Sequence, residues 1–170
     1  MSKAQPFVAI VMGSDSDFPT VSAAVEVLEA FSIRCEVKVT AAHRTPEATH
    51  SYIREADARG CAVFIAAAGM AAHLAGTVAA LTQKPVIGIP IDAGALSGMD
   101  SLLSTVQMPG GVPVACVAIG KAGAKNAGYL AAQILALGDP ALAKRLAEDR
   151  AENARSVAEK DKNLQKQLKK

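Results

Sequence analysis

The sequence predicts an open parallel α/β sheet with helices on both faces. Five apolar runs of strand length alternate with segments of helical spacing, which is the pattern of a doubly wound sheet. The chain is 51% hydrophobic and only 4% aromatic, so its 170 residues can bury a core built from Ala, Val, Leu and Ile. We therefore expect one domain over 1–170, with an α/β core at 7–137 and a further helix at 140–170.

The first strand is expected at 7–12, where a continuous apolar run suits a central strand buried on both faces. The polar stretch 14–17 follows it and leads into a helix after Pro19. The hydroxyls and backbone N–H groups of this stretch can hold a phosphate, and the Asp17 carboxylate can accept from ribose hydroxyls. The alternative is that Ser16 or Asp17 only caps the helix. The expected buried face of the helix comprises Val21, Ala24, Val25 and Leu28.

The second strand precedes a turn that holds both a titratable group and a fixed cation. Apolar Cys35, Val37 and Val39 alternate with polar residues, which predicts a half-buried strand. Thr45 and Pro46 fit the N-cap and first position of the next helix. His43 and Arg44 thus lie between strand and helix, at the carboxyl end of a parallel strand, where ligands bind. A capping turn that happens to contain a histidine is the alternative.

The third strand leads into a loop of small residues. Helical spacing of Ala48, Tyr52, Ile53 and Ala56 precedes it, and His50 in that helix is read as a surface residue. The strand is expected at 62–66. The loop at 67–76 lets a ligand approach closely, since its side chains are small. His73 is the exception, and we favour a structural role for it over proton transfer.

The fourth and fifth strands are expected at 85–90 and 114–119. The segment 91–113 between them is long for a plain connection, so we expect it to be partly helical near 98–106 and to border a pocket or another subunit. An alanine-rich helix at 122–137 permits close helix packing. The final helix has too little apolar surface to stand alone and fades into a solvated or frayed end, so we expect it to pack on a neighbouring subunit.

Strand order brings three loops together. Five strands separated by helices favour the flavodoxin-like order 2-1-3-4-5, which makes the first strand the neighbour of both the second and the third. The loops that contain Ser14, His43 and Gly69 then converge on one crevice. This convergence favours a functional role for His43 over a capping turn.

Composition argues against several other classes. The net charge is only +2, half of the Lys and Arg lie from Ala141 onward, and the few aromatic residues are scattered, which disfavours a nucleic-acid surface. The three cysteines, Cys35, Cys61 and Cys116, lack metal-type spacing and are expected to be buried, reduced thiols. No signal-peptide pattern or membrane-spanning run is present, so a cytoplasmic protein without membrane partners is expected.

Five motifs follow one another along the chain: Gly13-Ser14-Asp15-Ser16-Asp17, Ala42-His43-Arg44-Thr45-Pro46, Ala71-Ala72-His73-Leu74, Asp100-Ser101-Leu102-Leu103-Ser104 and Gln107-Met108-Pro109-Gly110-Gly111-Val112-Pro113. In this order they resemble the bacterial class I PurE family of N5-carboxyaminoimidazole ribonucleotide mutases, and the resemblance runs from about Val8 to Leu137. It implies a flavodoxin-like sheet, a cytoplasmic homo-octamer and no metal or organic cofactor. It also implies an isomerase of purine (IMP) biosynthesis that moves a carboxyl group from the exocyclic nitrogen to the ring carbon of an aminoimidazole ribonucleotide.

The resemblance also assigns roles to residues of this chain. His43 would be the acid–base residue, and the small residues Ala68, Gly69, Ala71 and Ala72 would wall in carbon dioxide. Phosphate and ribose would be held by Ser14, Ser16, Asp17 and Arg44. Further substrate contacts would come from Gly69, His73 and Leu74.

Three positions depart from the family pattern, which commonly has Ser at Ala41, Gly at Met70 and Pro at Ala75. These departures affect the hydrogen bonds that support the site and the local shape of its loops. They do not affect the acid–base residue. The animal-type relatives, which carboxylate aminoimidazole ribonucleotide directly, typically carry Lys at the position of Arg44 and lack the Ala-Ala-His-Leu motif. The mutase is therefore preferred over the direct carboxylase and over a non-enzymatic nucleotide-binding module.

Overall fold

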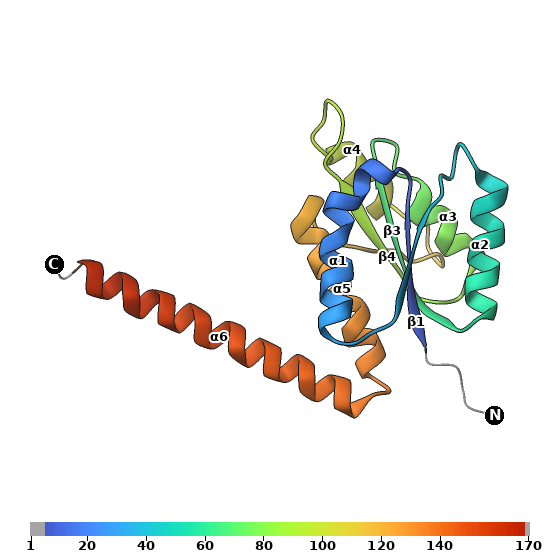
Figure 1. Cartoon of the computed structure of the whole chain (residues 1–170). Coiled ribbons are helices and arrows are strands. Elements are labelled where there is room, and N and C mark those ends of the chain that lie inside the picture. Colours follow the sequence, from blue (N-terminus) through green and yellow to red (C-terminus); the bar gives the residue numbers. More distant parts are fainter. Residues whose placement is uncertain (1–5, 169–170) are drawn as a thin grey trace.

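The computed structural model describes residues 6–168, which form one parallel sheet between two layers of helices (Figure 1). The strands are β1 (Phe7–Met12), β2 (Cys35–Val39), β3 (Cys61–Gly69), β4 (Val86–Ile91) and β5 (Ala115–Cys116). The helices are α1 (Phe18–Ala30), α2 (Pro46–Ala58), α3 (Leu74–Leu81), α4 (Met99–Val106), α5 (Gly120–Ala136) and α6 (Pro140–Leu168), with a short 3₁₀ turn, η1 (Asp15–Asp17).

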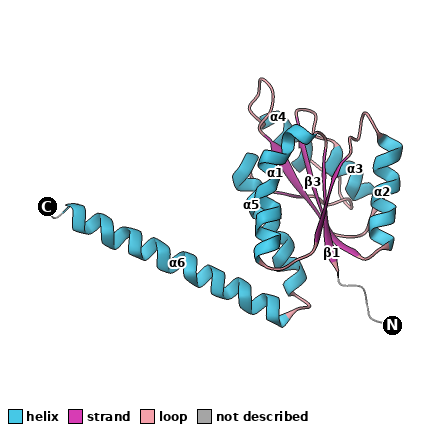
Figure 2. Ribbon diagram, in the orientation of Figure 1, coloured by secondary structure: helices cyan, strands magenta, loops and turns pink. Residues whose placement is uncertain are grey.

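The sheet has the order β2-β1-β3-β4-β5, and every neighbouring pair is parallel, as Figure 2 shows. This confirms the predicted flavodoxin-like topology. Since β1 lies between β2 and β3, the carboxyl ends of all three strands open on the same edge of the sheet.

Alternate residues of β1 supply two separate cores. Val8, Ile10 and Met12 pack on the side of α1 and α5. Phe7, Ala9 and Val11 pack on the side of α2 and α3. All six are buried, because successive side chains of a strand point to opposite faces and both faces are covered (Figure 1). The continuous apolar run of the sequence is thus explained.

The edge strand β2 differs from its predicted half-buried pattern. Cys35 packs against the core, but Val37 and Val39 are 39% and 48% exposed. Alternation identified the strand correctly. It overestimated burial because β2 is the edge strand and pairs only with β1.

The fifth strand is shorter than predicted. Only Ala115 and Cys116 pair with β4, opposite Ile87 and Gly88. The chain then turns into α5, which begins at Gly120 with φ of 73°, rather than ending a strand there. The left-handed backbone that this turn needs is accessible to glycine at little steric cost.

Two helices bury slightly different faces from those expected. In α2, Ala48 is exposed and Thr49 is buried, since the Thr49 hydroxyl lies 2.7 Å from that of Thr40 at the end of β2. In α1, Val25 is only partly buried, whereas Ala23 and Val27 join the core.

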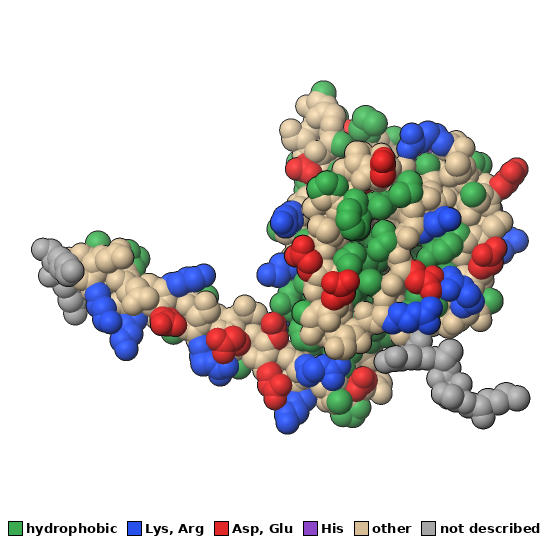
Figure 3. Space-filling model, viewed as in Figure 1, with side chains coloured by type: hydrophobic (Ala, Val, Ile, Leu, Met, Phe, Trp, Pro, Cys, Tyr) green, Lys and Arg blue, Asp and Glu red, His purple; other side chains and the backbone are tan. Residues whose placement is uncertain are grey.

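Helix α6 runs away from the body of the molecule (Figure 1). It stays helical to Leu168 with its last described residues exposed, so the end is solvated, as one of the two predicted alternatives held, and it is not frayed. Of its described residues only Leu142 is buried, and charged side chains line much of its length (Figure 3). Within 6–168, no helix is both long and apolar enough to cross a membrane.

The three cysteines are free thiols. Only Cys61 is fully buried, and burial raises the pKa of its thiol to about 11. Cys35 and Cys116 are half-buried, so the prediction of buried thiols holds fully for one of the three.

Candidate active site

A cavity of about 480 Å³ lies where the loops after β1, β2 and β3 meet. All eight site residues predicted from the sequence line it: Ser14, Ser16, Asp17, His43, Arg44, Gly69, His73 and Leu74. The predicted convergence of the three loops is therefore confirmed. The cavity wall also includes Ala93, from the chain after β4, which the sequence reasoning missed.

The first loop is organised by a capping box. The Ser14 hydroxyl accepts a hydrogen bond from the Ser16 backbone N–H (3.3 Å), and the Asp17 carboxylate accepts one from the Ser14 N–H (3.2 Å). Ser14 thus caps the 3₁₀ turn η1. Asp17 occupies the N-cap position of α1, as one of the two predicted alternatives held, but its side chain makes no capping bond to that helix. The Ser16 hydroxyl points to Ser14 at 2.8 Å, which gathers two hydroxyls at the cavity.

Asp17 is the buried acid of this loop, with 9% of its surface exposed. Burial raises the pKa of its carboxyl group above the usual value, while the hydrogen bond from Ser14 and the charge of Arg44 oppose that rise. The desolvated carboxylate is a strong acceptor for a ligand hydroxyl that replaces the lost water.

Arg44 ties the second loop to the first. Its guanidinium donates a hydrogen bond to the Gly13 carbonyl at 2.6 Å, which holds a fixed positive charge beside the Ser14 turn. The turn itself is closed by the Thr45 hydroxyl, which accepts from the Ala41 N–H at 3.0 Å. α2 begins at Pro46 as predicted, but Thr45 makes no side-chain capping bond to it.

The second and third loops place two histidines in contact. His43 Nε2 and His73 Nδ1 are 2.8 Å apart, with ring centroids 4.9 Å apart and ring planes at 84°. His73 occupies the N-cap position of α3 without capping it. The sequence reasoning favoured a structural role for His73 and missed this contact. The strand order held the relevant signal, since the loops after β2 and β3 both flank β1.

The third loop is shaped by Gly69 and Met70. A side chain at Gly69 would place its Cβ 2.9 Å from that of Ala93, so glycine here lets the chain after β4 approach the cavity. Met70 has φ of 53°, the left-handed region that favours glycine, and it is 59% exposed. The family-pattern Gly would relieve this strain. Ala75, the third departure, is buried in the core of α3.

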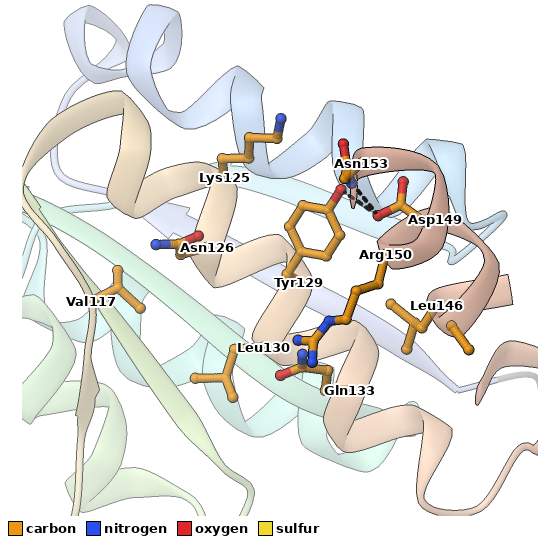
Figure 4. A pocket seen from close by; sticks show the side chains of 11 residues that line it. Val117, Lys125, Asn126, Tyr129, Leu130, Gln133, Leu146, Asp149, Arg150 and Asn153 are labelled. Atoms are coloured by element: carbon orange, nitrogen blue, oxygen red, sulfur yellow. Dashed lines mark hydrogen bonds between the residues drawn. The ribbon is translucent and has the colours of Figure 1, made fainter. Parts of the chain in front are cut away.

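A larger cavity of about 860 Å³ lies between α5 and α6 (Figure 4). Its Tyr129 hydroxyl and Asn153 amide both donate to the Asp149 carboxylate at 3.0 Å, so these polar groups satisfy one another. It does not include the loops after β1, β2 and β3, and none of the predicted site residues lines it. We therefore place the candidate active site in the smaller cavity.

Within residues 6–168, no group of three or more His, Cys, Asp or Glu side chains lies close enough together to hold a metal ion. The polar groups that line the candidate cavity are two serine hydroxyls, one carboxylate, one guanidinium and two imidazoles. Such a set suits a phosphorylated sugar and proton transfer.

A family model, curated proteins and solved structures that are similar to this chain all belong to one family. The family model described as AIR carboxylase matches residues 7–156. The N5-carboxyaminoimidazole ribonucleotide mutase of Bacillus subtilis is 53% identical over 160 residues, which is 94% of this chain and 99% of that protein. The mutase of Pyrococcus abyssi is 56% identical over 141 residues, 83% of this chain and 80% of its own. The crystal structure of Treponema denticola PurE matches with a TM-score of 0.85 and 31% identity, covering 94% and 98% of the two chains.

Proposed function

This chain belongs to the AIR carboxylase family, and from that premise we propose that it converts N5-carboxyaminoimidazole ribonucleotide to 4-carboxy-5-aminoimidazole ribonucleotide. It is an isomerase of purine biosynthesis, like the mutases it resembles over nearly its whole length. The observation that carries the site assignment is the single cavity in which His43 and Arg44 meet the Ser14 turn.

The proposed chemistry needs one group that both gives and takes a proton. The carboxylate leaves the exocyclic nitrogen as carbon dioxide, and that nitrogen then takes a proton. Carbon dioxide next bonds to the ring carbon, which loses its proton. His43 fits both transfers because an imidazole titrates near neutrality, whereas the Arg44 guanidinium does not.

The remaining lining residues suit binding and retention. Ser14, Ser16 and Arg44 supply hydroxyls and positive charge for the phosphate, and Asp17 accepts from the ribose. Ala68, Gly69 and Ala71 form a small-residue wall that suits retention of carbon dioxide. Ala72, expected in that wall, is instead buried and does not line the cavity.

An ultraviolet assay with two substrates tests this function. The purified protein should interconvert the two carboxylated ribonucleotides without ATP. Turnover only of unmodified aminoimidazole ribonucleotide with bicarbonate-derived carbon dioxide would favour the direct carboxylase. Ribonucleotide binding without turnover of either substrate would favour a binding module and refute the enzyme.

Arg44→Lys is expected to weaken substrate binding. Lysine keeps the charge but loses the planar fork that pairs with two phosphate oxygens, so the apparent KM should rise about tenfold, on the scale of one charged hydrogen bond. Steady-state kinetics and direct titration with substrate measure the change. An unchanged KM would remove Arg44 from the phosphate site.

The assembly is proposed to be a cytoplasmic homo-octamer that needs no metal or organic cofactor. Its support is a set of exposed apolar side chains that a neighbouring subunit would cover, including Leu96, Met99, Leu103 and Val106 near α4. α6 would pack on a neighbour, since it buries so little within its own chain. Light scattering at micromolar concentration should give the octamer mass, and a monomer would contradict the proposal.

A further inference from the structure

We propose that His73 is a positioning residue that accepts a hydrogen bond from His43 and thereby leaves His43 Nδ1 as the proton-transfer atom. The inference rests on the proposed function and adds to the lining role that the sequence suggested for His73. Its basis is the 2.8 Å contact between His43 Nε2 and His73 Nδ1.

His73 is well anchored for this role. Its backbone N–H donates to the Ala71 carbonyl at 2.9 Å, and its own carbonyl accepts from both the N–H and the hydroxyl of Thr77 at 3.0 Å. Both histidines are exposed, and within residues 6–168 neither ring makes another hydrogen bond. The backbone bonds that fix His73 at the start of α3 therefore make it the group that restrains the His43 ring.

Proton counting limits how the two rings can share this contact. A neutral imidazole has one N–H donor and one bare nitrogen acceptor. Two nitrogens 2.8 Å apart hold one proton between them, because two facing N–H groups would repel and two bare nitrogens would form no bond. Either His43 Nε2–H donates to His73, or His73 Nδ1–H donates to His43.

The two arrangements differ in what they leave on His43 Nδ1. If His43 donates, the neutral ring has a bare Nδ1, which takes a proton from the substrate carbon as a base. The resulting imidazolium keeps its Nε2–H bond to His73 and returns the Nδ1 proton to the substrate nitrogen in a later cycle. If His73 donates, Nδ1 of neutral His43 already carries a proton, so each transfer there requires a second proton to move between the rings. In the proposed chemistry His43 alone gives and takes the proton. Together with the contact geometry, this points to His43 as the donor of the hydrogen bond to His73.

Two His73 variants test the role through kinetics. His73→Leu removes the acceptor and should lower kcat about ten- to a hundredfold, less than loss of the acid–base group itself, and its effect on kcat should exceed its effect on KM. His73→Asn can place its amide oxygen near the position of Nδ1, so it should retain most of the activity. His50→Leu is the matched control, because His50 is the third histidine and lies exposed in α2.

The tautomer of the neutral His43 ring is a second test, because a purely structural role of His73 would not change it. Nitrogen-15 spectra of imidazole-labelled protein at alkaline pH should show His43 protonated on Nε2, with assignment by the single-histidine variants. His73→Leu should convert His43 to a mixture of tautomers. Protonation of His43 on Nδ1 in the unaltered protein, an undiminished kcat in His73→Leu, or equal losses in the Leu and Asn variants would each overturn the inference. If the unaltered protein binds ribonucleotide without turnover, the proposed function fails while the spectra still test the histidine pair.

Discussion

His43→Asn is expected to fold, assemble and bind the ribonucleotide while losing turnover by a factor of about a hundred to ten thousand, the usual scale for deleting a positioned acid–base group. Asparagine keeps a polar side chain of similar reach but has no group that titrates near neutrality. The His43 ring is exposed and is bonded only to His73 among the described residues, so the fold does not depend on it. Single-turnover kinetics with both carboxylated ribonucleotides measure the loss.

The matched comparison is His73→Asn, which should lose far less activity because its amide can still accept a hydrogen bond. Substrate titration by calorimetry checks that both variants bind, and circular dichroism checks that both fold. Substantial turnover in His43→Asn, or an equal collapse in His73→Asn with binding intact, would move proton transfer away from His43.

The strands of the sheet were predictable where burial is complete. The run Phe7–Met12 is apolar throughout and ends at Gly13, and the strand in the structure has these bounds. Burial on both faces makes every residue of such a strand apolar, so the local signal suffices. At the edges the signal weakens, because exposure of β2 and the length of β5 depend on which other elements reach them.

The site was predictable as a place rather than as a set of contacts. Parallel strand order alone brings the loops of Ser14, His43 and Gly69 together. The pairing of His43 with His73 joins residues 30 apart in the sequence and depends on the shapes of two turns. In one of these turns Met70 has a left-handed backbone conformation. Methionine rarely adopts this conformation, so the local sequence does not predict it.

Gly123, in the first turns of the alanine-rich helix α5, lies against the chain that leads into this helix. A Cβ at this buried position would lie 1.6 Å from the Ala118 carbonyl oxygen, and that atom belongs to the backbone. Gly123→Ala should therefore destabilise the protein, because the chain before α5 must shift to make room. Overpacking should lower the free energy of unfolding by about 3 kcal/mol. The higher helix propensity of alanine restores about 1 kcal/mol, so the net loss is about 2 kcal/mol.

For a chain of this size, that loss lowers the unfolding midpoint by roughly 4–8 °C. Thermal unfolding followed by circular dichroism at one protein concentration measures it, since subunit association also shifts the midpoint. Gly138→Ala is the control: Gly138 follows α5, its backbone is not left-handed, and its nearest neighbour to an added Cβ is 4.0 Å away. We expect the control to change the midpoint by less than about 2 °C, as surface substitutions do. Equal unfolding midpoints for the two variants would contradict this prediction. They would mean that the backbone before α5 can move away from an added Cβ at no cost in stability.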